Sequence, residues 1–210
     1  MLKPRREATS HGRPRRAAPT IDVARSNTTV GAALRGRPCL TFIALLICTT
    51  TATAQANRSV YTPLGDKDCK TIKSAEAGDE GYEARCRGTA GYTLLLNEGD
   101  LRQNITIITP QGKQHSLDLW TVISGGFSSL GPKAEWRLDK ASAPVALILR
   151  YNASEDPDKP DKRTSYLAVT KITPTEICVT EKISPGPTAN EDARRAADAA
   201  STKPCLKDQK

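Results

Sequence analysis

Six cysteines, two histidines and 23 acidic residues are the side chains of this 210-residue chain best suited to chemistry. His11 lies near the start, so His115 is the only imidazole after residue 56. Most zinc, copper and iron sites gather several imidazole or thiolate ligands, and a Ser-His-Asp arrangement would depend on His115 alone. We therefore expect no metal site, no cofactor and a structural role for His115.

Carboxylate chemistry needs fewer residues, because two acids suffice for glycoside hydrolysis. Glu98 and Asp100 are close in sequence, but they flank Gly99 in an expected turn, where acids are usually solvated. No calcium-loop or phosphate-loop spacing is present. We assign no catalytic residue, and a carboxylate-based hydrolase of cell-envelope polysaccharide stays an alternative.

A third group of polar residues is predicted to share one face of a sheet. Residues 133–139 alternate between apolar and charged side chains, which is typical of a half-buried strand and places Glu135 and Arg137 together on the face opposite Trp136. Arg150, on the strongly apolar segment 145–151, could face them from a neighbouring strand. The group is interpreted either as a surface ion pair or as a partly buried polar cluster that marks a ligand site.

The cysteines indicate a disulfide framework rather than a reactive site. Four of them follow residue 56: Cys69, Cys86, Cys178 and Cys205. Four cysteines allow three pairings, and we favour Cys69 with Cys86 and Cys178 with Cys205 because each pair closes a local segment. Loops of this size correspond to about 3–4 kcal/mol of stabilisation apiece. No C-x-x-C spacing supports a zinc site.

The N-terminal segment has the three-part layout of a secretory signal peptide. An apolar run at 40–47 follows basic residues and precedes a stretch rich in Ala and Thr with small-x-small sites near residue 56. The run is too short to span a bilayer, which needs about 20 apolar residues. We assign 30–56 as the signal peptide, and 1–29 either as a basic disordered extension or as sequence upstream of the true start. Residues 57–206 then form a single exported domain, periplasmic or extracellular, with 207–210 as a tail.

Removal of the leader changes the charge of the chain. The whole sequence carries 31 basic and 23 acidic residues, a net charge of +8. Residues 1–56 hold 9 of the basic and 2 of the acidic residues, which leaves 22 basic and 21 acidic residues and a net charge of +1. With no arginine-rich run or zinc-finger spacing after residue 56, the sequence argues against nucleic acid as a partner.

The elements that must position these residues are mostly strands. Period-two patterns predict strands at 102–109, 116–122 and 133–139, and the apolar run at 145–151 is typical of a central strand. Further strand candidates are 82–86, 91–96, 165–172 and 176–183. Short connections at 97–100 and 173–175 predict hairpins, and 124–132 and 152–164 are expected to be loops.

One helix is predicted near the C-terminus. Thr188 and Glu191 have capping-box spacing. An alanine stripe follows them, opposite Arg194, Arg195 and Asp198. The fold class is therefore α+β: a mostly antiparallel sheet or small sandwich with a packed C-terminal helix.

Several segments, in order along 59–206, resemble an uncharacterised family of small secreted four-cysteine proteins of proteobacteria. They are SVYTPLGDKDC (59–69), CRGTAGY (86–92), EGDLR (98–102), SLGPKAEWRL (129–138), ALILRY (146–151), and the segment from Cys178 to Cys205 with its ARRAAD helix. The resemblance implies export and a four-cysteine domain, and it supplies no catalytic residue.

The sequence thus predicts a non-catalytic exported domain that binds a protein, a cell-wall fragment or a small molecule. The feature that would distinguish the hydrolase alternative is a concave site with two acids about 5–10 Å apart.

Overall fold

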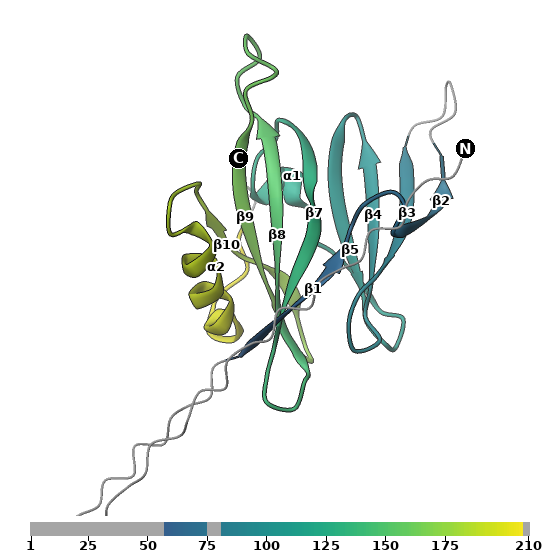
Figure 1. The fold of residues 1–210 in the computed structure, drawn as a ribbon, viewed down its shortest axis with the longest axis vertical. Helices are drawn as coiled ribbons and strands as arrows, with labels where there is room; N and C mark the ends of the chain where they lie inside the picture. Colours follow the sequence, from purple (N-terminus) through teal and green to yellow (C-terminus); the bar gives the residue numbers. More distant parts are fainter. Residues whose placement is uncertain (1–56, 75–80, 208–210) are drawn as a thin grey trace, which may run out of the picture. The chain divides into compact units, whose positions relative to one another are not determined.

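The computed structural model describes residues 57–74 and 81–207 (Figure 1). The proposed signal peptide and the extension before it lie outside the described residues. Along the described chain the elements are β1 (Arg58–Pro63), β2 (Cys69–Lys73), β3 (Tyr82–Arg87), β4 (Thr93–Gly99), β5 (Arg102–Ile108), β6 (Gln114–Ser116), α1 (Leu119–Val122), β7 (Phe127–Leu138), β8 (Pro144–Ser154), β9 (Thr164–Ile172), β10 (Ile177–Ile183), α2 (Ala189–Asp198) and the 3₁₀ turn η1 (Ala200–Thr202).

The strands form one sheet in the order β10-β9-β8-β7-β5-β4-β3-β2, with β1 paired to β7 and β6 paired to β5. Every strand pair is antiparallel except β5 with β7, which meet at the single pair Arg102 and Ser128. The expected α+β class, a mostly antiparallel sheet with a C-terminal helix packed on it, is confirmed. Figure 1 shows α2 beside the β8-β9-β10 side of the sheet.

The inner faces of the two halves of the sheet enclose one hydrophobic core. Leu94 and Ile105 from β4 and β5 belong to the same buried cluster as Leu147 and Leu149 from β8. Trp136 of β7 is fully buried in this cluster, and its indole N–H donates to Thr62 Oγ1 of β1 at 2.9 Å. Burying the indole satisfies both its apolar ring and its single donor.

Strand β8 is buried on both faces. Its inward residues join the main core, while Ala146 and Ile148 on its outer face pack with Leu167, Val169 and the alanines of α2. Ala193, Ala197 and Ala200 are buried there, so the predicted alanine stripe is confirmed as the packing face of the helix. Small side chains let the helix approach the sheet closely, and longer side chains beside the stripe reach the strands.

Six of the eight predicted strands are confirmed within one to three residues, and a seventh, 133–139, is the second half of β7. The strand predicted at 116–122 is wrong, because β6 ends at Ser116 and α1 begins at Leu119. The α1 turn starts where the Leu119 N–H donates to Asn104 Oδ1, a contact between segments that local periodicity does not reveal. The loop predicted at 124–132 is also wrong beyond Gly126: 127–130 pair with β8 through backbone bonds that need no apolar side chains.

The helix predicted near the C-terminus is confirmed, but its capping box is not. Thr188 is the N-cap residue and makes no side-chain capping bond; its hydroxyl donates to Asp192 Oδ2 at 2.8 Å instead. The two favoured cysteine pairings are both present, as Cys69–Cys86 between β2 and β3 and as Cys178–Cys205 between β10 and the segment after η1. No helix among the described residues has the length and apolar character needed to cross a membrane.

Candidate functional site

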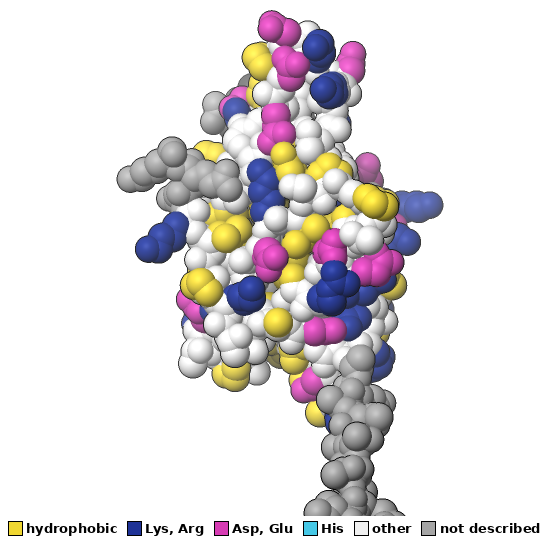
Figure 2. All heavy atoms as spheres, turned by 90° about the vertical axis from the view of Figure 1, so that its left-hand side faces the viewer, with side chains coloured by type: hydrophobic (Ala, Val, Ile, Leu, Met, Phe, Trp, Pro, Cys, Tyr) yellow, Lys and Arg dark blue, Asp and Glu magenta, His cyan; other side chains and the backbone are white. Residues whose placement is uncertain are grey.

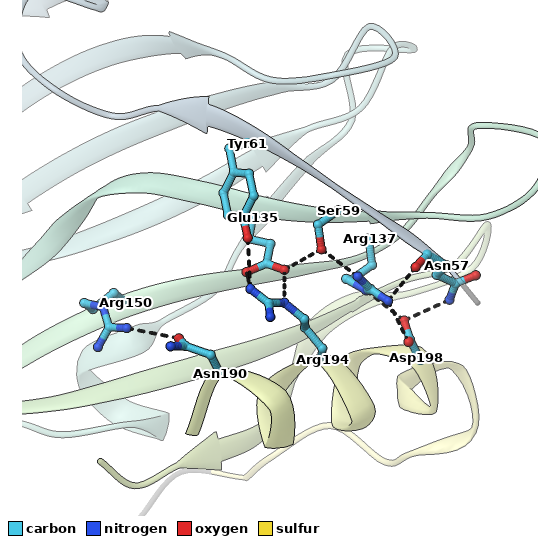
Figure 3. Close-up of polar contacts among 9 residues, drawn as sticks. All are labelled: Asn57, Ser59, Tyr61, Glu135, Arg137, Arg150, Asn190, Arg194 and Asp198. Carbon is cyan, nitrogen blue, oxygen red and sulfur yellow. Dashed lines mark hydrogen bonds and ion pairs between the residues drawn. The ribbon is translucent and has the colours of Figure 1, made fainter. Parts of the chain in front are cut away.

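The predicted polar cluster lies on the outer face of the sheet, at the edge of α2 (Figure 3). Glu135 and Arg137 alternate with the buried Trp136 on β7, and Arg150 lies on β8 two positions after Ile148, the register partner of Glu135. The three side chains therefore share one face, as the strand alternation predicts. They do not bind one another, because each takes its partners from β1, β9 or α2.

Arg137 is enclosed. Its Nε and Nη2 donate to the two oxygens of Asp198 at 2.9 and 2.7 Å, its Nη1 donates to Ser59 Oγ at 2.6 Å, and Nη2 also donates to the Asn57 carbonyl at 2.7 Å. Only 7% of the Arg137 side chain is exposed. The forked pairing with a carboxylate is the geometry that arginine favours in buried ion pairs. At this end of the contact between α2 and the sheet, which we call the closed end, the cation is buried and paired with a carboxylate.

Glu135 has a similar but less enclosed set of partners. Its Oε1 accepts hydrogen bonds from Ser59 Oγ at 2.5 Å and from Arg194 Nε at 2.7 Å, and Arg194 also donates to the Tyr61 hydroxyl at 3.0 Å. Burial alone would raise the pKa of Glu135, but the hydrogen bonds from Arg194 and Ser59 outweigh it and lower the pKa below 4.5. The Glu135 hydrogen bond is the main cause of the raised pKa of Arg194. Both groups are charged at neutral pH.

Arg150 differs from Arg137 in having no carboxylate partner among the described residues. Its Nη1 donates to Ser165 Oγ at 2.9 Å and its Nη2 to Asn190 Oδ1 at 3.3 Å. Gly131 leaves space for the aliphatic part of this side chain, because a Cβ on Gly131 would be only 2.8 Å from Arg150 Cβ. The guanidinium is thus fixed in place by neutral partners and keeps its full positive charge.

A cleft of about 310 Å³ opens between the first half of α2 and the outer face of β7, β8 and β9. Three of its lining side chains are cations and one is an acid, so the cleft carries a surplus of positive charge. Lys133 is one of these cations, and its Nζ lies 5.4 Å from the centre of the Tyr61 ring. The lining residues are Tyr61, Pro132, Lys133, Glu135, Ile148, Arg150, Leu167, Asn190, Ala193 and Arg194.

The charge surplus is local to the cleft. Figure 2 shows the face of the molecule that carries α2, where basic and acidic side chains lie side by side with hydrophobic side chains between them. The acids of the first turn of α2, Glu191 and Asp192, are not among the lining residues. The helix N-terminus adds a partial positive charge near Asn190. The cleft is therefore suited to an anionic group.

The sequence did not identify the partners of the three predicted residues as site residues: Asn57, Ser59, Tyr61, Asn190, Arg194 and Asp198. Arg194 and Asp198 were placed opposite the alanine stripe, which is wrong, because both flank the stripe and reach the sheet. Only Arg195 of that group points away; 72% of its side chain is exposed and it pairs with Asp192. Charge was the sequence signal that could have identified Arg194 and Asp198. A helix that packs over Glu135 and Arg137 is expected to carry residues of opposite charge at its edges.

The other residues considered for chemistry remain apart. His115 lies on β6, where burial and then the charge of Lys113 lower its pKa, and its ring makes no hydrogen bond to a described residue. Ser116 donates to Asp118 directly, so no Ser-His-Asp relay is formed there. Glu98 accepts from Gln103, and Asp100 is paired with Arg102. Glu176 lies near Cys178 and Cys205, but both of these sulfurs are in a disulfide.

No family model, curated protein or solved structure matches this chain. The functional argument therefore rests on the geometry of the site.

Proposed function

We propose that this protein is a non-catalytic exported domain that binds an anionic ligand in the cleft between α2 and the sheet. The observation that supports it is the contrast in the cleft: Glu135 already has Arg194 as its partner, whereas Arg150 is held by neutral groups and has no carboxylate partner in the described part of the chain. A carboxylate or phosphate group bound beside Asn190 would neutralise Arg150, as Asp198 neutralises Arg137.

Export is part of the proposal and has its own support. Two disulfides favour an oxidising compartment, since such bonds rarely persist in the cytosol. The N-terminal layout of a signal peptide indicates the same route. Intact mass of the full chain, expressed in a bacterial host and measured with and without reductant, tests this part. We expect a start near residue 55 or 57 and four hydrogens fewer than the reduced chain.

The hydrolase alternative is not favoured by this cleft. Glu135 is the only acid among the described residues that line it, whereas glycoside hydrolysis needs a pair. Its lowered pKa also makes Glu135 a poor proton donor at neutral pH.

Binding is tested by calorimetric titration with three probes: acetyl-alanyl-alanine, its C-terminal amide, and glycerol 3-phosphate. We expect the free carboxylate or the phosphate to bind and the amide not to bind. Comparing the dipeptide with glycerol 3-phosphate shows whether the cleft prefers a carboxylate or a phosphate. In Arg150→Gln the affinity should fall at least tenfold, which corresponds to about 1.4 kcal/mol.

Lys140→Gln provides the matched control, because it removes the same charge from the exposed turn between β7 and β8, outside the cleft. Affinity should be unchanged in this variant. Absence of binding by both anions at millimolar concentration, or equal affinity in Arg150→Gln, would contradict the proposal.

A further inference from the structure

The two tryptophans differ in burial, and the exposed one lines a second pocket, away from α2. Trp136 is fully buried, whereas Trp120 on α1 is 48% exposed. Trp120 lines a pocket of about 310 Å³ together with Asn97, Gly99, Asp100, Arg102 and Asn104. This volume is at the lower end of the roughly 300–1,000 Å³ typical of small-molecule sites. The indole N–H donates to no described residue, so both ring and donor remain available.

The two asparagines of the pocket face each other across the β4–β5 ladder, and only one of them is used by the fold. Asn104 donates from Nδ2 to Ser116 Oγ at 3.0 Å and accepts the Leu119 N–H on Oδ1 at 3.1 Å. The Oδ1 of Asn97 is buried and accepts no hydrogen bond among the described residues. The Nδ2 of Asn97 also donates to no described residue and is not among the buried atoms, so the end of this amide that a ligand can reach is a donor.

The charged residues of the pocket balance each other. Arg102 pairs with Asp100, donates from Nε to the Gly125 carbonyl at 2.8 Å, and lies over the Phe127 ring at 5.1 Å. These contacts fix the guanidinium. The Asp100 side chain is 82% exposed, so its carboxylate has room to accept further hydrogen bonds. Because one cation and one anion line the pocket, it suits a neutral ligand, unlike the α2 cleft.

We propose that this pocket binds one pyranose ring of a neutral oligosaccharide. A pyranose has an apolar C–H face that can lie on an indole ring and a rim of hydroxyls that both donate and accept. The carboxylate of Asp100 provides acceptors for those hydroxyls, and Nδ2 of Asn97 and the indole N–H of Trp120 provide donors. An apolar peptide side chain would cover Trp120 but leave Asn97 unpaired, so the sugar accounts for more of the pocket.

The test is a titration followed by ¹⁵N–¹H correlation spectra of the oxidised protein, because its two indole N–H signals report on Trp120 and Trp136 separately. Trp120→Ala assigns the signals. The probes are cellotetraose and chitotetraose at millimolar concentration. We expect the Trp120 signal to shift and saturate with at least one of them, while the Trp136 signal does not move.

Asn97→Ala is the decisive variant, because the Asn97 side chain makes no hydrogen bond to a described residue and its removal should leave the fold intact. Affinity should fall at least tenfold. Ile72→Ala, which truncates another half-exposed apolar side chain on β2, is the matched control and should bind as the unmodified protein does.

The proposal is overturned if neither oligosaccharide shifts the Trp120 signal, or if Asn97→Ala binds as tightly as the unmodified protein. Arg150→Gln should bind the oligosaccharide normally, so failure here is distinguishable from failure of the anion site.

Discussion

Arg137 and Arg150 lie on the same outer face of two neighbouring strands, and α2 provides them with different partners. Asp198, at the C-terminal end of the helix, brings a carboxylate to Arg137; Asn190, in the first turn, brings only an amide to Arg150. One cation is neutralised and enclosed, and the other is fixed but uncompensated. The comparison teaches that one helix can close one end of a sheet face and leave a charged cleft at the other.

The closed end should be where the fold is most sensitive. Asp198→Ala leaves Arg137 almost fully buried with no counter-charge, and removing one partner of a buried ion pair costs about 3–5 kcal/mol. Because Asp198 is partly exposed, we expect a loss near the lower end, about 3 kcal/mol. Urea unfolding of this variant beside Arg150→Ala measures it. Equal losses in the two variants would remove the distinction between the ends.

The Cys178–Cys205 bond anchors the chain just beyond the closed end. Replacing both cysteines with serine should reduce the free energy of unfolding by about 3–4 kcal/mol, and the same change at Cys69 and Cys86 should have a similar effect on stability. Only the first pair lies beside α2, so only its loss should also weaken anion binding. Unfolding and calorimetry on the two double variants separate the effects; equal binding in both would contradict the anchoring role.

Glu135 lies between the two ends of the helix–sheet contact, and its protonation should make the stability of the fold depend on pH. Its pKa is lowered in the folded protein, so its contribution to stability is fully present above about pH 4.5 and is lost as the pH falls through the folded pKa. Glu135→Gln removes a charged hydrogen-bond acceptor worth about 1–2 kcal/mol at pH 7. Its stability loss should shrink in acid. A loss that stays constant from pH 7 down to pH 3 would be inconsistent with this account.

The open end should contribute least to folding. Arg150→Gln removes a partly exposed cation that has no carboxylate partner within residues 57–74 and 81–207, and the change in stability should stay within about 0.5 kcal/mol. Its effect should appear instead in the affinity for anions. A loss of several kcal/mol in urea unfolding would show that Arg150 is structural, as Arg137 is.

The elements that could be predicted from the sequence are those whose side chains follow a pattern of burial. The strand around Trp136 is predicted from its period-two pattern because it buries one face, and the strand around Leu147 from its apolar run because it is buried on both faces. The segments 116–122 and 127–130 were not, for opposite reasons. The first has an alternating pattern but is turned into α1 by Asn104, and the second has no pattern but is held by backbone bonds to β8.

The candidate site was predicted only in part. Strand alternation determined that Glu135, Arg137 and Arg150 share a face, since the side chains of a strand must alternate. The alanine stripe likewise determined which side of the C-terminal helix would pack.

Only the tertiary structure decided which partner each side chain has. The angle and position at which α2 crosses the sheet bring Asp198 to Arg137 and Asn190 to Arg150, and the pairing of β1 with β7 brings Ser59 and Tyr61 to Glu135. These contacts join residues that are 40 to 80 positions apart in the sequence, so no local pattern records them. The sequence by itself determined the face on which the charges lie, and packing between distant segments decided which of those charges was left unpaired.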